Sequence, residues 1–303
     1  MKTQFCPICG PKTAKIPLYS QNFKSSHLNK KVFSARRLPD RLRYKTVRCG
    51  NCGLVYADSI LEANKLAKLY KNSLLTYQGQ IDDLTKTYGH YLRSLEKFDV
   101  NKNSLLEIGC GNGFFFLEAK RQGYRKVSGV EPSLDAIKKA PKSVQKQIKN
   151  TMFNRKLFKK NSFDVICFFQ TFDHVLNPNK FLKDCHYLLK PGGLILAINH
   201  NVESLQAKIL KEKSPIIDIE HSYLYSKVTM PLIFKKNKFN VLKVSSTFNI
   251  YSLDYLFHLL PLSEKLKLRL ISIVNKSILK ELKLKLWLGN LLLIAQKPKS
   301  QGN

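Results

Sequence analysis

A glycine-rich stretch follows a short apolar run near the middle of the chain. Residues 105–113 are Leu-Leu-Glu-Ile-Gly-Cys-Gly-Asn-Gly, so Glu107 precedes three glycines at alternate positions, Gly109, Gly111 and Gly113. A parallel strand that ends in a tight glycine turn and leads into a helix presents backbone N–H groups to a ligand at the sheet's carboxyl edge. The dinucleotide fingerprint needs a further glycine where this chain has Phe114 or Phe116. The spacing therefore predicts a ligand-binding turn and excludes an NAD-type site.

Three histidines follow strand ends or lie in downstream loops, and they are the best candidates for acid–base chemistry. They are His174, which follows an aspartate, His200, and His221, which follows Glu220. A single loop histidine is structural more often than catalytic, but three on one rim favour a functional pocket. If His221 is a base, we expect Glu220 or another nearby carboxylate to orient it and to raise its pKa.

Two Cys-x-x-Cys-Gly knuckles stand near the N-terminus, formed by Cys6 with Cys9 and by Cys49 with Cys52. Two such pairs supply four thiolates, which suits a closed, structural Zn²⁺ site. The 39 residues between the knuckles exceed the usual spacing, so residues 11–48 are expected to form a β-ribbon or a flexible excursion. Four ordinary thiols or two disulfides are the alternatives.

Three further segments would position these side chains. Residues 126–131 are predicted to form a strand that ends at Glu131, and residues 162–169 a strand that leads into a loop beginning at Gln170. Residues 188–197 contain the end of a helix, a Pro-Gly-Gly turn and an apolar strand.

In this order, the segments resemble motif I and the following strands of the class I S-adenosylmethionine-dependent methyltransferases. The resemblance implies an α/β fold with a Rossmann-like, seven-stranded sheet. It also implies that Glu131 holds the ribose hydroxyls of S-adenosylmethionine and that Asn150 or Thr151 contacts the adenine. The predicted cofactor-binding residues are Glu107, Gly109, Gly111, Gly113, Glu131 and Gln170.

Residues 1 to about 250 resemble sugar C-methyltransferases and methyltransferases of polysaccharide gene clusters, which also combine a four-cysteine module with a downstream Glu-His pair. This resemblance implies that His174, Glu220 and His221 line the acceptor site. His221 would remove a proton beside a keto group to give an enolate, and Tyr70 or Tyr77 would assist. The chain has no counterpart of the further C-terminal domain of those enzymes, so O- or N-methylation stays open.

The predicted organisation has three parts: a zinc-binding ribbon over residues 1–57, a helical linker over 58–100 with a break near Gly79, and a methyltransferase domain over 101–303. The last two strands are expected at 239–246 and 287–296. Between them, residues 252–285 are apolar and rich in lysine. This helical insert has four interpretations: helices packed on the core, a lid, a dimer face or a membrane-surface helix.

The chain of 303 residues has 52 basic and 21 acidic residues, a net charge of +31. Compositional bias and a phosphate-bearing partner both explain this charge, because the lysines are scattered. The favoured partner is a small anionic acceptor such as a nucleotide sugar. RNA or protein methylation is the alternative, with Arg36, Arg37, Arg41 and Arg43 as the candidate patch. No secretory signal or membrane-spanning run is evident, so we expect a soluble, cytoplasmic protein.

Overall fold

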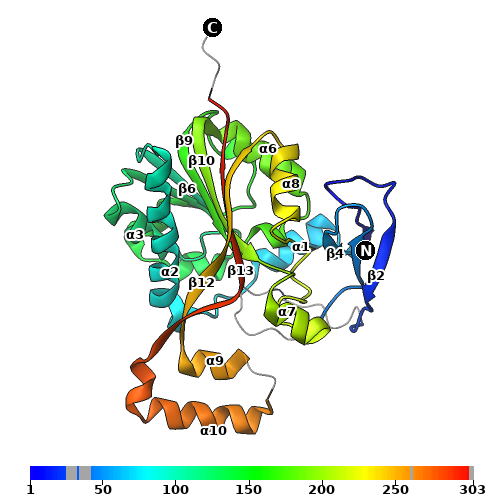
Figure 1. The fold of residues 1–303 in the computed structure, drawn as a ribbon. Helices are drawn as coiled ribbons and strands as arrows, with labels where there is room; N and C mark the ends of the chain where they lie inside the picture. The colour runs from blue at the N-terminus through cyan, green and yellow to red at the C-terminus, as the bar shows by residue number, and fades with distance from the viewer. Residues whose placement is uncertain (25–32, 34–41, 260–261, 300–303) are drawn as a thin grey trace.

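The computed structural model describes residues 1–24, 33, 42–259 and 262–299, and its centre is a seven-stranded, mostly parallel sheet (Figure 1). In spatial order its strands are β12 (Asn240–Ser252), β13 (Lys283–Gln296), β10 (Leu189–His200), β9 (Phe163–Phe169), β6 (Ser104–Ile108), β7 (Lys126–Val130) and β8 (Ile148–Lys149). The five strands from β10 to β8 are parallel, and β13 is antiparallel to both of its neighbours. The predicted α/β class and the seven-stranded sheet are confirmed.

Helices cover both faces of this sheet. The α-helices are α1 (Ala63–Lys71), α2 (Ile81–Arg93), α3 (Phe115–Arg121), α4 (Leu134–Lys138), α5 (Lys142–Gln145), α6 (Pro178–Leu188), α7 (Leu205–Leu210), α8 (Thr229–Lys236), α9 (Leu253–Leu259) and α10 (Glu264–Asn275). The 3₁₀ turns are η2 (Gln78–Gln80), η3 (Ser94–Phe98), η4 (Arg155–Leu157), η5 (Phe172–His174), η6 (Lys211–Lys213) and η7 (Ile278–Glu281). In Figure 1, α2 and α3 lie on one side of the sheet and α6 and α8 on the other.

The pattern of apolar residues explains this layering. Every residue of β9 is buried, as expected for a central strand of a parallel sheet with helices on both faces. Helix α6 begins at Pro178, after Asn177 accepts a hydrogen bond from the backbone N–H of Lys180. The residues that α6 buries against one face recur at helical spacing: Phe181, Leu182, Cys185 and Leu188.

A second, four-stranded sheet contains the N-terminal strands and one strand from far downstream. Its order is β11 (Tyr223–Leu224), β4 (Val55–Ala57), β3 (Thr46–Cys49) and β2 (Lys15–Tyr19). A further pair joins β1 (Lys2–Thr3) to β5 (Ser59–Ile60). The ends of the 11–48 excursion thus form the expected β-ribbon. Strand β11 directly follows the Glu-His pair, so the loop that carries His221 is anchored on the N-terminal sheet.

The linker helices break where the sequence predicts, between Lys71 and Gln78, ahead of Gly79. The last two strands are longer than expected, because β12 and β13 continue to pair with each other beyond the sheet. Within the described ranges, no helix combines the length and the apolar character needed to span a bilayer.

Candidate active site

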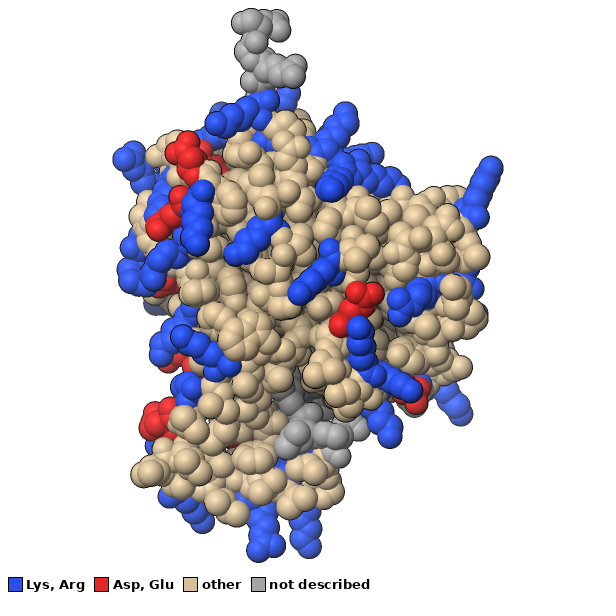
Figure 2. Space-filling view, viewed as in Figure 1, with Lys and Arg blue, Asp and Glu red and all other residues tan. Residues whose placement is uncertain are grey.

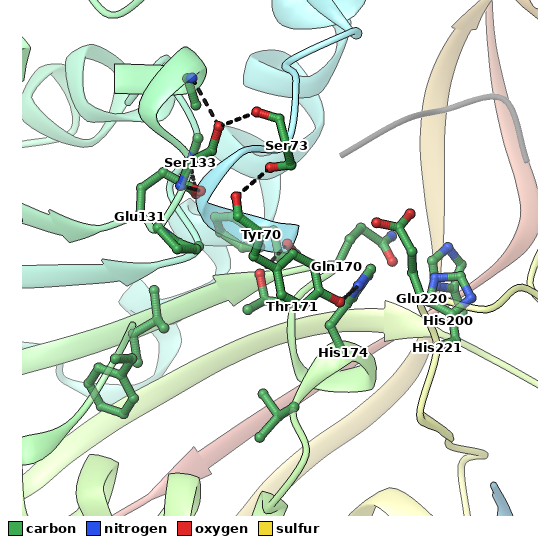
Figure 3. Close-up of a pocket in the computed structure, with 18 of the residues that line it drawn as sticks. Tyr70, Ser73, Glu131, Ser133, Gln170, Thr171, His174, His200, Glu220 and His221 are labelled. Carbon is green, nitrogen blue, oxygen red and sulfur yellow. Dashed lines mark hydrogen bonds between the residues drawn. The ribbon is translucent and has the colours of Figure 1, made fainter. Parts of the chain in front are cut away.

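A cavity of about 640 Å³ lies at the carboxyl ends of β6, β7, β9 and β10. One part of its wall comes from the glycine turn and Glu131, and another from the three loop histidines (Figure 3). In this close-up, Tyr70, Gln170 and Thr171 lie between the two groups. We call the first part the glycine side and the second the histidine side.

The glycine side is built mainly from backbone. Gly109 and Gly111 have φ angles of 74° and 54°, in the region that glycine adopts most readily. A Cβ atom at Gly109 would collide with the Thr171 side chain, and one at Gly111 would collide with the Tyr77 hydroxyl. Any other residue at these two positions would therefore be strained and would displace a side chain of the cavity.

Glu131 is buried at the end of β7 and faces this turn. Its Oε2 accepts the Gly111 N–H at 2.9 Å, and its Oε1 accepts the Ser133 N–H at 2.8 Å. Burial raises its pKa although both bonds lower it. Each carboxylate oxygen keeps a further lone pair, which fits the two vicinal hydroxyls of a ribose.

Two other polar groups on this side are buried without partners. Glu107 is 2% exposed, and its Oε2 accepts no hydrogen bond within the described part of the chain. Burial, followed by the charge of Glu131, raises the pKa of Glu107 well above its usual value. The side-chain amide of Gln170 likewise has no hydrogen-bond partner among the described residues. Such unpaired groups fit a bound ligand that supplies the missing partners.

The segment after α1 covers the glycine side. The Ser133 hydroxyl donates to the Ser73 carbonyl at 2.8 Å, and the Leu75 N–H donates to the Asp135 carboxylate at 2.8 Å. Farther along the chain, Asn150 donates to the backbone carbonyl of Glu131 at 2.9 Å. Neither Asn150 nor Thr151 is among the residues that line the cavity, whereas Met152 and Phe153 are. The sequence does not mark these two apolar residues, because no polar side chain or motif distinguishes them.

The histidine side is organised around Asp173. Its carboxylate is 1% exposed, and its Oδ2 lies 2.6 Å from Nδ1 of His200. Its Oδ1 lies 3.7 Å from Nε2 of His174. Burial alone would raise the pKa of Asp173, but the charge and hydrogen bond of His200, with smaller contributions from His174 and His221, lower it well below its usual range. Asp173 is therefore an ionised carboxylate that accepts a hydrogen bond from Nδ1–H of the His200 ring.

A backbone carbonyl orients the His221 ring. Its Nδ1 lies 2.8 Å from the Ile216 carbonyl oxygen, which can only accept. The proton of a neutral His221 is thus assigned to Nδ1, and Nε2 carries the lone pair that a general base needs. The role expected for Glu220 or another nearby carboxylate in orienting this ring stays a prediction. The ring centres of His174 and His200 lie 4.9 Å and 4.6 Å from that of His221.

The linker tyrosines lie on different sides of the cavity. The Tyr70 hydroxyl is 3.3 Å from Nδ1 of His174, whereas Tyr77 covers Gly111. Burial, and next the charge of Glu220, raise the pKa of Tyr70 well above its usual value, so Tyr70 keeps its proton. Glu220 is buried and lines the cavity. The structure thus brings together His174, His200, Glu220, His221 and Tyr70, with Asp173 at their centre.

The Asp173–His200 pair was not predicted as a pair. The sequence contains the pattern Phe-Asp-His directly after the fourth strand, and His200 was noted at the end of the next strand. Neighbouring parallel strands bring their carboxyl ends to the same edge of the sheet, which places the two residues near each other but does not predict the bond between them. Together with His221 the pair offers three metal-type ligand atoms within 4.8 Å. The distance of 2.6 Å between Asp173 Oδ2 and His200 Nδ1 is shorter than the roughly 3 Å between two ligand atoms of one metal ion. It fits a charge-assisted hydrogen bond.

The four N-terminal cysteines form a separate cluster. Their sulfur atoms all lie within 4.8 Å of one another, and Sγ of Cys6 is 3.6 Å from Sγ of Cys52. This distance is close to the roughly 3.8 Å edge of a tetrahedron with 2.3 Å zinc–sulfur bonds. The glycines after the knuckles, Gly10 and Gly53, have φ angles of 91° and 78°. All seven cysteines are described, and none forms a disulfide.

Residues 77–244 match a family model described as a methyltransferase domain. The chain belongs to this methyltransferase family. It is 33% identical over 103 residues to a ubiquinone biosynthesis O-methyltransferase of Maricaulis maris, which covers 32% of this chain and 40% of that protein. The protein of the same name from Nitrobacter winogradskyi is 31% identical over 128 residues, 38% of this chain and 49% of that one. The part of this chain that matches these two relatives thus spans less than half of their length.

Among solved structures, a SAM-dependent methyltransferase from Archaeoglobus fulgidus has a TM-score of 0.49 and 18% identity, over 73% of this chain and 99% of that one.

Proposed function

We propose that this methyltransferase transfers a methyl group from S-adenosylmethionine to a small sugar acceptor, nucleotide-linked or related to a polysaccharide. The observation that carries the proposal is the histidine side, where three rings and Glu220 surround an ionised aspartate beside the cofactor cradle. Such a cluster can take a proton from an acceptor and orient it through several hydrogen bonds. The buried, unpaired Glu107 and the accepting lone pairs of Glu131 support the choice of cofactor.

In the proposed reaction, Nε2 of His221 accepts a proton from the acceptor, either from the carbon beside a keto group or from a hydroxyl. S-adenosylmethionine bound at the glycine turn and Glu131 would supply a sulfonium-linked methyl group to the acceptor's new electron pair, and its sulfur would keep the electrons of the broken bond. His200, held by Asp173, and His174, held by Tyr70, donate hydrogen bonds that fix the acceptor. Holding both partners at reacting distance supplies a large share of the acceleration.

Transfer to oxygen is the first alternative within this proposal. Relatives that are about 30% identical bear the name of an O-methyltransferase, which favours a hydroxyl acceptor. His221 would then deprotonate a hydroxyl, and the remaining roles would be unchanged.

RNA or protein methylation has less support. Of the four arginines in the candidate patch, Arg36, Arg37 and Arg41 lie outside the described residues. The fourth, Arg43, donates to the Ser20 carbonyl at 3.0 Å and pairs with Glu212 at 2.6 Å. An arginine engaged in this way is less available to a phosphate.

The deciding experiment is a transfer assay with methyl-labelled S-adenosylmethionine. Purified protein is incubated in parallel with 4-keto nucleotide sugars, hydroxylated small molecules and bulk RNA. Label in the sugar supports the proposal, and label on a carbon or an oxygen distinguishes its two forms. Label in RNA alone would replace the proposal with the alternative.

The proposal also includes one structural zinc ion held by Cys6, Cys9, Cys49 and Cys52, and the boundaries 1–57, 58–100 and 101–303. The gathering of the four sulfur atoms within 4.8 Å of one another supports the zinc. Seven unpaired cysteines fit a reducing compartment, which supports a cytoplasmic location. Metal analysis of protein purified without added zinc tests the ion directly.

A further inference from the structure

The two outermost strands carry a projection that we call the arm, residues 249–287. Beyond the main sheet, β12 and β13 pair only with each other, from Asn249 opposite Leu286 to Ser252 opposite Lys283. Helices α9 and α10 and the turn η7 fold together at the end of this ribbon. Figure 1 shows α9 and α10 standing away from the body of the molecule.

The arm exposes an unusual number of apolar side chains. Of 19 large apolar side chains that are exposed in the described part of the chain, seven belong to the arm: Leu266, Leu268, Ile273, Ile278, Leu279, Leu282 and Trp287. Ile278, in η7, is 93% exposed. Among the arm residues with described side chains, the apolar residues that are fully buried are Tyr255 and Val274. Exposed apolar groups at this density mark an interaction surface.

The same segment is positively charged. Residues 253–285 contain seven lysines and arginines and three acidic residues. Lys265, Arg269 and Lys276 are exposed on or next to α10, among the apolar side chains. In Figure 2, lysine and arginine side chains project from the end of the molecule that the arm forms.

This combination favours one kind of partner. A second copy of the chain, packed arm to arm, would bring like charges together at an apolar contact, which is unfavourable. A nucleic acid would use the charges but would leave side chains such as Ile278 in water. The interface of an anionic bilayer accepts apolar side chains between its headgroups and attracts the surrounding lysines. It therefore satisfies both features of the arm.

The arm is continuous with the wall of the cavity. Tyr251 and Tyr255, at its root, line the cavity, as does Gln206 of α7. Helix α7 contacts β13 and exposes Leu205 and Ile209, which are 74% and 67% exposed. These two residues are four positions apart, so they share one helix face.

We propose that the arm and this face of α7 dock on an anionic lipid bilayer and bring the cavity next to the membrane surface. An acceptor sugar attached to a lipid would be presented there. That consequence rests on the proposed function, whereas docking itself does not.

The test is flotation of the full-length protein with vesicles of phosphatidylcholine, with and without phosphatidylglycerol. We expect binding to the anionic vesicles and its loss at high salt. The double variant Leu268→Glu with Ile278→Glu should bind these vesicles at least about tenfold more weakly than the wild type. A matched control, Leu117→Glu with Leu242→Glu, changes exposed apolar residues outside the arm and should bind as the wild type does. Calorimetry with S-adenosylmethionine reports that each variant is folded.

Three results would overturn docking. One is no flotation with anionic vesicles, and another is equal binding by the arm variant and the control. The third is a wild-type dimer in solution that the arm variant converts to monomer, because a second copy would then cover the arm. None of these results would contradict methyl transfer to a soluble acceptor, so the proposed function is tested separately.

Discussion

The glycine side and the histidine side of one cavity are built by different means. On the glycine side, the turn after β6 and the end of β7 present backbone N–H groups, and Glu131 accepts two of them. On the histidine side, side chains from η5, the end of β10 and the loop before β11 meet around Asp173. A binding site formed by backbone groups requires only a few correctly spaced glycines in one segment. A site formed by side chains requires segments that are far apart in the sequence to pack against one another.

The two sides also differ in how their charges are balanced. Burial raises the pKa values of Glu107 and Glu131, and no cation among the described residues offsets this effect. The pKa of Asp173 is lowered, because histidines surround it. The glycine side therefore holds acidic groups that suit a ligand with cationic and hydroxyl groups, whereas the histidine side is balanced internally. This division fits a cofactor on one side and proton transfer on the other.

The largest expected effect tests the histidine side. In His221→Ala, turnover should fall by roughly 10²–10⁴, the usual contribution of a positioned acid or base. The affinity for S-adenosylmethionine should hardly change, because His221 does not touch the glycine turn. His186→Ala, on α6 and outside the cavity lining, is the matched control. Near-normal turnover of a stably folded His221→Ala protein would remove this residue from the base role and favour transfer driven by proximity.

The glycine side should show the opposite pattern. Glu131→Ala removes two acceptor oxygens from the proposed ribose contact, a loss on the order of 1.5–3 kcal/mol, or about 10- to 150-fold in affinity. Turnover at saturating cofactor should fall much less. Glu118→Ala, on α3, provides a control carboxylate outside the cavity. Unchanged cofactor affinity in Glu131→Ala, measured by calorimetry, would remove Glu131 from the site.

This contrast explains what the sequence could predict. The glycine turn and the strands that end before Gln170 and at Glu131 follow from local patterns, such as Gly-x-Gly-x-Gly after an apolar run, whereas the seven-stranded sheet was implied by the resemblance to methyltransferases. The sequence also marked each histidine singly, because each follows a strand or an acid. It could not predict the Asp173–His200 bond or the carbonyl that orients His221, since both depend on how loops from separate segments pack. The extension of β12 and β13 into the arm was missed, although Lys283-Leu284-Lys285-Leu286 alternate between polar and apolar residues as a half-exposed strand does.

An effect of intermediate size is expected from the four-cysteine cluster, and it should reach the histidine side but not the glycine side. Ser222, next to His221, accepts the Ala57 N–H at 3.0 Å and donates its own N–H to the Asp173 carbonyl at 2.8 Å. In Cys49→Ser with Cys52→Ser, zinc should be lost and turnover should fall by about tenfold, because β4 no longer holds this loop in place. Cofactor affinity should be retained, and Cys185→Ala, a buried cysteine outside the cluster, should keep its zinc. Retained zinc in the double variant would contradict the four-cysteine site.

The smallest expected effect concerns pH and Asp173. Its pKa is lowered on folding, so its ionised form contributes stability that is complete above the unfolded value of about 3.9 and is lost as the pH falls through the folded value. Asp173→Asn keeps the acceptor for His200 but not the charge. At pH 7 we expect a melting temperature about 2–4 °C lower, equivalent to roughly 1 kcal/mol.

That difference should shrink as the pH is lowered below about 4, because the unfolded wild type then binds a proton that the folded protein takes up only at a lower pH. Turnover should fall with a changed pH profile, while cofactor affinity stays constant. Asp164→Asn, also buried but outside the cavity lining, should cost stability without altering the pH profile of turnover. If Asp173→Asn and the wild type kept identical pH profiles, Asp173 would serve only to pack η5 against β10. The histidine side would then depend on His221 and its backbone carbonyl alone.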